Sequence, residues 1–376
     1  MNNKILVCCL LVCLCISCSS KQKGSNTNIK KDYFIDLEKK VKGEMSYLDI
    51  FKRIELIPLE TSNESLINSI DKILRFNGKF YILDKKQHQV LIFNQNGGFE
   101  KKINKLGRGP GEYQNIQDIE INRFTNNIEV MEPWGVISVF DTLGNFVEKY
   151  RLPPSVRAVH YFIHINKDTI VFYTNSEKNR LTFFSKTQNR LITKYHEIPE
   201  WISRNTPLNP SRSPFFLYKD TINFYEVFAN NVFYIKGCDL KLKYSWDFGK
   251  HNFSYKDLPE GKSVQFYKDF LINSEYAFNF FYNIENEKYI VTSFIFNNRP
   301  YSLLLDKKTK TNFLFNQFKK GTAFFGNCFF DKGCYTVMDT RKLKVFIEPE
   351  VLDTKSKNIF KNLTIDSNPT IVKYHY

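Results

Sequence analysis

Cysteine is scarce in most of this sequence. Five of the 8 cysteines lie within the first 18 residues, and only Cys238, Cys328 and Cys334 follow them. Three scattered cysteines exclude a disulfide scaffold, and beyond residue 18 no CxxC or Cys/His spacing predicts a zinc site. A Cys328–Cys334 bridge beside an expected hairpin and buried, reduced thiols are the two alternatives.

Catalytic signatures and basic clusters are missing as well. The sequence has no GxSxG and no HExxH, so it carries neither the hydrolase nucleophile elbow nor the zinc-peptidase motif. The net charge is +15, but Lys and Arg are scattered and basic runs are short, such as Lys30–Lys31 and Lys101–Lys102. Because nucleic-acid binding requires clustered charge, we expect a solvated basic surface and no nucleic-acid partner.

Only one long apolar run is present, Ile5 to Ile16, and it is too short to span a bilayer as a mature helix. Lys4 precedes the run and Ser17–Cys18 ends it, as in an export signal. The segment "LCISC" resembles a bacterial lipoprotein signal, in which Cys18 becomes the first residue and is lipidated. Cys15 stands where such signals usually carry Leu, and an ordinary secretory signal cut nearby is the alternative.

This resemblance divides the chain into a signal peptide, 1–17, a flexible tether, 18–31, and a folded domain, 32–376. The tether is rich in Ser, Lys, Asn, Gln and Gly and has almost nothing to bury. A lipid on Cys18 would make the membrane a partner. The "SSKQK" that follows has no acidic residue of the kind associated with surface export. We therefore expect an outer-membrane lipoprotein that faces the periplasm.

Aromatic residues, by contrast, are abundant. They make up 16% of the chain, with 36 Phe and 21 Tyr beside 3 Trp, and such residues favour pleated, half-buried strands. One unit recurs, in which short apolar strands alternate with polar loops and Gly-containing turns. Its copies cover 77–104, 126–152, 167–195, 219–246, 286–315 and, in part, 326–339.

With its connecting loops, each unit has roughly 45–55 residues, which is typical of propeller blades. Such blades bury their faces against one another in a closed ring. We predict an all-β, six-bladed β-propeller of mostly four-stranded antiparallel blades. Short helical insertions are expected near 258–276 and 352–363. Ring closure should place the strand at 51–60 and the strand at 369–375 in one sheet with the hairpin at 326–339.

The run "KLGRGPGEYQNIQDIEI", 105–121, is the most glycine-rich part of the chain. It does not match a phosphate loop, because Glu112 and Tyr113 follow the glycines instead of Lys-Ser/Thr. A dinucleotide fingerprint would open a helix, whereas an alternating strand follows here. We predict that the run crosses from the outermost strand of one blade, 99–104, to the innermost strand of the next, 116–122.

Two kinds of role are open for this loop. The structural one is a sharp crossing in which glycines permit positive φ angles and Tyr113 anchors the loop between blades. The functional one is a ligand site at the channel mouth formed by Arg108, Glu112, Tyr113 and Asp118.

The chain resembles a known family, the six-bladed β-propeller lipoproteins of Gram-negative bacteria, which are related to NHL-repeat propellers. The matching residues are "IPLET" at 57–61, "ILDKKQHQVLIFNQNGGF" at 82–99, "GRGPGEY" at 107–113 and "NPTIVKY" at 368–374. The resemblance implies the fold and the location. It brings no catalytic residues that can be carried over.

Other candidate residues come from side-chain patterns. His160 and His164 alternate with Phe162 on one face of a strand, so they are weak candidates for a channel metal. Asp118 and Glu120 alternate on an expected inner strand. Aromatic segments at 211–218, 279–283 and 294–301 hold more rings than alternating burial requires, which suits sugar or peptide binding.

We therefore expect a monomeric, lipid-anchored binding or scaffolding module for a glycan, peptide or protein partner. The alternative is a propeller enzyme, a metal-assisted lyase or lactone hydrolase with its site in the central channel. No catalytic residue and no cofactor are predicted, and a structural or channel Ca²⁺ is left open.

Overall fold

The structure is a computed structural model that describes residues 33–38, 42–174, 177–199, 202, 210–319, 328–330 and 333–376. The predictions for the signal peptide, the tether and Cys18 lie outside the described residues. No helix in the described ranges is long and apolar enough to cross a membrane.

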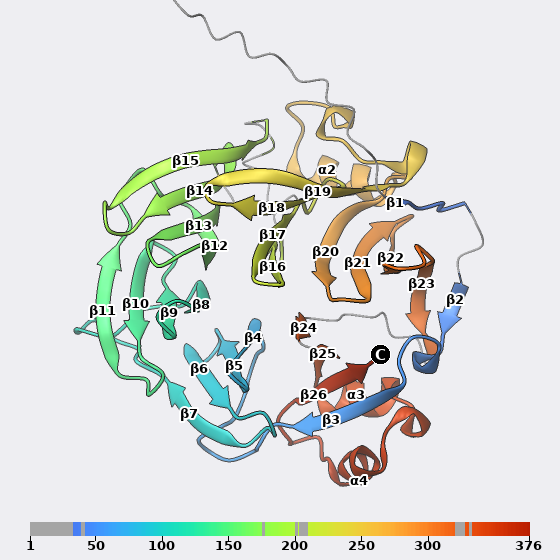
Figure 1. Cartoon of the computed structure of the whole chain (residues 1–376), viewed down its shortest axis with the longest axis horizontal. Helices are drawn as coiled ribbons and strands as arrows, with labels where there is room; N and C mark the ends of the chain where they lie inside the picture. Colours follow the sequence, from blue (N-terminus) through green and yellow to red (C-terminus); the bar gives the residue numbers. More distant parts are fainter. Residues whose placement is uncertain are drawn as a thin grey trace, which may run out of the picture. The chain divides into compact units, whose positions relative to one another are not determined.

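Six small sheets follow one another around a central axis, as predicted (Figure 1). Each blade runs from an inner strand to an outer one, and most strands are antiparallel to their neighbours. Blades 1 to 3 contain four strands each. Blade 1 consists of β4 (Lys72–Phe76), β5 (Lys79–Asp84), β6 (Gln89–Phe93) and β7 (Phe99–Ile103). Blade 2 consists of β8 (Asp118–Asn122), β9 (Asn127–Met131), β10 (Val136–Phe140) and β11 (Phe146–Arg151). Blade 3 consists of β12 (Val159–His164), β13 (Thr169–Thr174), β14 (Asn179–Ser185) and β15 (Arg190–Glu197).

Blades 4 and 5 each carry a fifth, outermost strand that comes from the start of the folded domain. The short strands β1 (Tyr33–Phe34) and β2 (Lys42–Met45) add in parallel to β19 and β23. The sequence analysis did not predict them. The four-stranded parts are β16 (Phe215–Tyr218), β17 (Thr221–Tyr225), β18 (Asn231–Lys236) and β19 (Asp239–Asp247), and β20 (Phe278–Glu285), β21 (Tyr289–Phe296), β22 (Arg299–Asp306) and β23 (Asn312–Phe318).

Blade 6 closes the ring with strands from both ends of the domain. It consists of β24 (Cys328–Phe330), β25 (Gly333–Met338), β26 (Thr370–His375) and β3 (Arg53–Pro58). Leu56 of β3 lies opposite Val372 of β26 in an antiparallel pair. The buried Asn368 amide donates to the carbonyls of Glu60 and Ser65 at 2.6 and 2.8 Å. The predicted closure is therefore confirmed.

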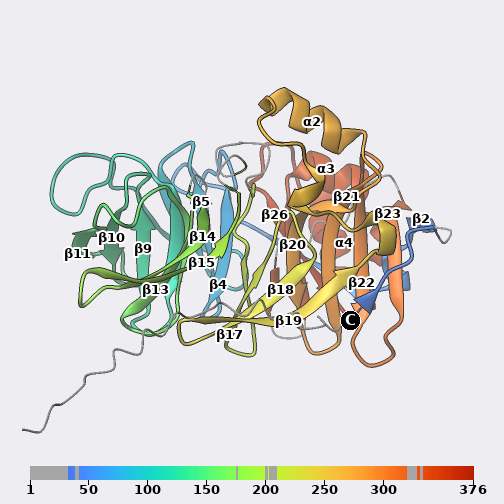
Figure 2. The same ribbon diagram turned by 90° about the horizontal axis from the view of Figure 1, so that it is seen from above.

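The two predicted insertions contain helices, and a 3-10 turn, η1 (Tyr47–Asp49), also precedes β3. Between blades 4 and 5 lies α2 (Val264–Ile272), after the short 3-10 turns η3 (Gly249–His251) and η4 (Tyr255–Asp257). Between β25 and β26 lie α3 (Thr340–Phe346), which was not predicted, η6 (Pro349–Val351) and α4 (Thr354–Asn362). Ser263, Asp339 and Asp353 cap the three α-helices. Figure 2 shows α2 and α3 toward the same side of the ring.

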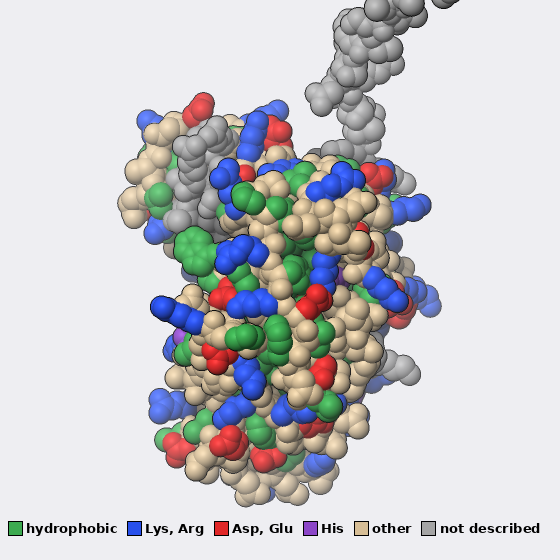
Figure 3. Space-filling view, turned by 90° about the vertical axis from the view of Figure 1, so that its left-hand side faces the viewer, with side chains coloured by type: hydrophobic (Ala, Val, Ile, Leu, Met, Phe, Trp, Pro, Cys, Tyr) green, Lys and Arg blue, Asp and Glu red, His purple; other side chains and the backbone are tan. Residues whose placement is uncertain are grey.

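Most of the aromatic excess is core. In the segments that hold more rings than alternating burial requires, Phe215, Phe216, Phe280, Tyr282, Phe294 and Phe296 are all buried. Core packing accounts for these rings, because both faces of a blade pack against neighbouring blades and each buries a set of alternate residues. On the rim formed by blades 1 to 3, charged side chains of both signs are interspersed (Figure 3).

The cysteines fit the alternative of reduced thiols. Cys238 and the buried Cys334 are not in disulfides. In the β24–β25 pair, Cys334 lies opposite Phe329, and Cys328 lies opposite Tyr335. A Cys328–Cys334 bridge is therefore not formed.

Candidate functional site

The glycine-rich loop joins the outer strand of blade 1 to the inner strand of blade 2, as predicted. The Glu112 carboxylate accepts the Gly109 N–H at 2.7 Å. A Cβ at Gly107 would stand 2.0 Å from the same carboxylate, so a larger residue there would make the Glu112 side chain shift. The fully buried Tyr113 hydroxyl accepts the Lys105 N–H at 3.2 Å and lies 3.1 Å from the Ile103 carbonyl oxygen. The loop thus satisfies its own polar groups.

The structure does not bring the four channel-mouth candidates together. Arg108 is exposed, and among the described residues no ion pair joins it to Glu112. Tyr113 is held inside the loop between blades, with its ring at right angles to that of Phe140. Asp118 alone reaches the inner strands, where it is 1% exposed.

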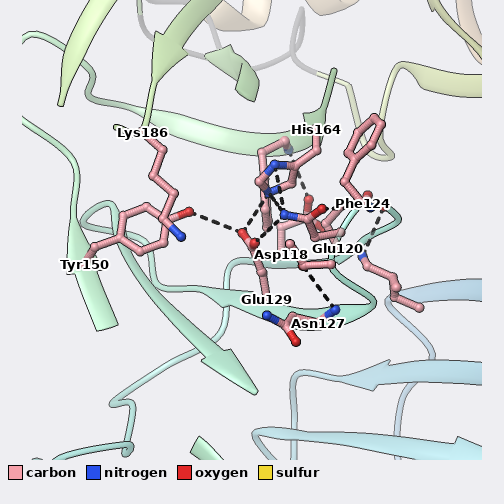
Figure 4. A network of polar contacts seen from close by, with 12 residues as sticks. Asp118, Glu120, Phe124, Asn127, Glu129, Tyr150, His164 and Lys186 are labelled. Carbon is pink, nitrogen blue, oxygen red and sulfur yellow. Dashed lines mark hydrogen bonds and ion pairs between the residues drawn. The ribbon is translucent and has the colours of Figure 1, made fainter. Parts of the chain in front are cut away.

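Asp118 belongs to a network of polar side chains in blades 1 to 3 (Figure 4). Lys72 on β4 donates to both Asp118 oxygens, at 2.9 and 3.1 Å, and lies 3.5 Å from Glu120. The backbone N–H of Phe162, on β12, donates to Asp118 at 3.3 Å. Burial raises the pKa values of Asp118 and Glu120, although Lys72 opposes the shift.

The second part of this network is a buried pair of side chains between blades 2 and 3 (Figure 4). His164 Nε2 lies 2.9 Å from Glu129 Oε2, and both side chains are 1% exposed. Asn122 donates to the other carboxylate oxygen at 3.2 Å, and the Tyr150 hydroxyl donates to Oε2 at 3.2 Å. Burial alone would raise the pKa of Glu129, but the hydrogen bond and charge of His164 hold it below the usual value.

The His160 side chain is not part of this network. The β12–β13 pairing shifts between Val159 and Tyr161, so His160 sits in a bulge and the expected alternation with His164 is interrupted. Burial and the charge of Lys85 lower the pKa of His160 to about 4. Within the described residues, no group of three or more His, Cys, Asp and Glu side chains could hold a metal ion.

Sequence reasoning missed a second buried pair, between blades 3 and 4. His196 Nδ1 lies 3.0 Å from Glu226 Oε1, and both side chains are largely buried. Burial raises the pKa of Glu226 to about 7, and burial together with the charge of Arg180 lowers that of His196 to about 4. Both groups are therefore mostly uncharged at pH values between these two pKa values. No sequence motif predicts the His196–Glu226 pair, because the two residues come together only when blades 3 and 4 pack.

We expect Glu226→Gln to stabilise the protein at pH 8 and to change little at pH 5. A carboxyl group whose folded pKa is raised from 4.5 to about 7 destabilises the fold increasingly as the pH rises between those values. Glutamine mimics the protonated form, so the gain should reach at most about 3 kcal/mol above pH 7. Urea unfolding at both pH values measures it. With the exposed Glu350→Gln as control, an equal effect of Glu226→Gln at both pH values would contradict this assignment.

A concave surface lies beside α2. This hollow has a volume of about 550 Å³. Phe266, Phe270 and Tyr276 give it an aromatic lining, and Asp269 and Glu275 stand among its polar residues. Phe266 is 37% exposed, and its ring stacks on that of Phe270 at 6.2 Å. Sequence reasoning treated this stretch only as a helical insertion.

Solved structures support the architecture. A Bacteroides fragilis protein described as a "putative exported protein" aligns with a TM-score of 0.69 at 17% identity, over 89% of this chain and 99% of that one. A member of the DUF4221 family from Bacteroides vulgatus aligns with a TM-score of 0.50 at 12% identity, over 86% and 98%. At these identities the likeness shows the fold alone.

Sequence comparison gives the family without an activity. No curated protein matches this sequence. The family described as "Domain of unknown function (DUF4934)" matches residues 32–375, which is almost the whole of the predicted folded domain. The chain belongs to this DUF4934 family.

Proposed function

We propose that the protein is an exported, lipid-anchored propeller that acts as a non-catalytic binding module for a glycan, peptide or protein. The observation that carries the binding role is the aromatic hollow beside α2, because exposed rings flanked by polar groups are typical of ligand sites. The "LCISC" segment supports the anchor. Membrane fractionation of wild-type and Cys18→Ala chains tests that part, and a mutant that stays with membranes would refute it.

The buried polar groups between blades 1, 2 and 3 support the non-catalytic part of the proposal. Asp118 is bound by Lys72, and Glu129 is bound by His164, Asn122 and Tyr150. A general acid or base must reach a proton on the substrate. Asp118, Glu129 and His164 instead form contacts that link β4, β8, β9 and β12, so their role in this proposal is structural.

Glycan and peptide arrays test the binding role. The chain without its signal peptide and Cys18, residues 19–376, should give discrete hits that disappear in the double variant Phe266→Ala/Phe270→Ala. Phe124→Ala is the matched control, because Phe124 is 38% exposed at a turn of blade 2. Blank arrays, or hits that survive the double variant, would contradict the proposal. Stoichiometric Ca²⁺ or Zn²⁺ in the purified protein would favour the enzyme alternative.

A further inference from the structure

The charged groups around the hollow beside α2 are mostly acidic. Asp269 accepts the Gln265 side-chain amide at 2.8 Å, and neither Asp269 nor Glu275 forms an ion pair with any described residue. Lys250 also lines the hollow, but its ammonium group lies 2.5 Å from the Glu38 carboxylate. Two carboxylates and one ammonium therefore line the hollow, and that ammonium is already paired with a third carboxylate, in a chain whose net charge is +15.

The aromatic lining has the same preference. The face of an aromatic ring carries partial negative charge and attracts cations. Phe266 already attracts one, because the Lys262 ammonium lies 5.8 Å from its ring centroid. Phe270 stacks on Phe266 with an interplanar angle of 27°, so the two rings form a continuous surface along α2.

His251 adds a buried hydrogen-bond acceptor to the lining. It is 7% exposed, and its Nδ1 lies 2.7 Å from the Glu275 carbonyl oxygen. A carbonyl can only accept, so Nδ1 carries the proton and Nε2 of the neutral ring is an acceptor. Nε2 is closed off from solvent and has no hydrogen-bond partner among the described residues, and a Glu38 oxygen lies 3.9 Å from it.

From these observations we propose that the hollow beside α2 binds an organic cation, an ammonium or guanidinium group presented by the ligand. The inference rests on the proposed binding function and names the chemical class that this site takes. The exposed carboxylates and the ring faces both favour a positively charged donor, and the unpartnered Nε2 of His251 lies beneath them. An anionic ligand would meet Asp269, Glu275 and Glu38, and a neutral sugar would leave both hollow carboxylates without a cation.

Paired probes that differ in whether their amines are acetylated test the proposal by calorimetry on residues 19–376. Hexalysine is compared with its side-chain-acetylated form, and a glucosamine hexamer with an N-acetylglucosamine hexamer. We expect the amine forms to bind and the acetylated forms to bind at least tenfold more weakly. The two pairs also separate a peptide source of the ammonium from a sugar source. Because the chain carries +15 overall, non-specific binding of these cations elsewhere on the surface is disfavoured.

Charge-removing variants locate the site. Asp269→Asn and Glu275→Gln should each weaken amine binding by about tenfold, whereas Asp366→Asn, an exposed carboxylate on another insertion, should leave it unchanged. Both hollow residues are exposed, and unfolding curves confirm that the variants fold. Equal binding of amine and acetylated forms, unchanged binding by the two variants, or no binding of any probe would each overturn the inference. Array hits for neutral or acidic ligands that depend on Phe266 would still leave the proposed function standing.

Discussion

Replacing His164 by leucine is expected to lower the free energy of unfolding by about 3 to 5 kcal/mol. The substitution removes the 2.9 Å contact to Glu129 while both positions stay 1% exposed. A buried carboxylate would then keep only Asn122 and Tyr150 as partners. Urea unfolding of wild type and variant at pH 7 measures the loss.

A double-mutant cycle and a pH series give this prediction its controls. The double variant His164→Leu/Glu129→Leu should recover part of the loss, because no buried charge is left unpaired. In wild type the pKa of Glu129 is lowered, so its contribution is present above pH 4.5 and is lost as the pH falls through the folded pKa. Without His164, burial should raise that pKa, and the deficit should shrink on acidification. Additive losses and a deficit independent of pH would contradict the assignment.

The second large effect is expected at Gly97, in the turn between β6 and β7. Its φ is +88°, and an added Cβ would stand 2.1 Å from the Pro58 carbonyl oxygen on β3. Pro58 belongs to blade 6, so neither backbone can move without disturbing the contact between blades 1 and 6. Positive φ and overpacking together should make Gly97→Ala cost about 3 to 5 kcal/mol.

Gly237 provides the matched control for this substitution. Its φ is +60°, but no atom lies within 4 Å of an added Cβ. Gly237→Ala should therefore cost only the backbone strain, about 1 to 2 kcal/mol. Thermal and urea unfolding of both variants separate strain from overlap. Equal losses in the two variants would show that the contact with Pro58 has no effect on stability.

Much of the fold could be predicted because its units repeat. Each full copy of the repeat became the second to fourth strands of a blade, and the partial copy at 326–339 became the first two strands of blade 6. The "GRGPG" loop became the crossing between blades 1 and 2. The closure by 51–60 and 369–375 could be foreseen because a ring has to join its ends. These features are local in sequence or required by topology.

The rest depended on contacts that no local pattern encodes. The two-residue β1 and four-residue β2 are too short for a periodic signal, and they are strands only because β19 and β23 offer open edges. Lys72 was not foreseen as the partner of Asp118, since the pair forms between two blades. The bulge at His160 changed the alternation on which the histidine hypothesis depended.

The pairing of the first strands also bears on the order of folding. β1, β2 and β3 pair with β19, β23 and β26. The paired residues are therefore far apart in the sequence: Tyr33 pairs with Trp246, Lys42 with Phe315, and Pro58 with Thr370. Contacts this distant in sequence make folding slow, because a long loop must close before any pairing is gained. During synthesis β1 can therefore pair only once β19 has emerged, and β3 only once β26 has emerged. The last strand made determines when the ring can close.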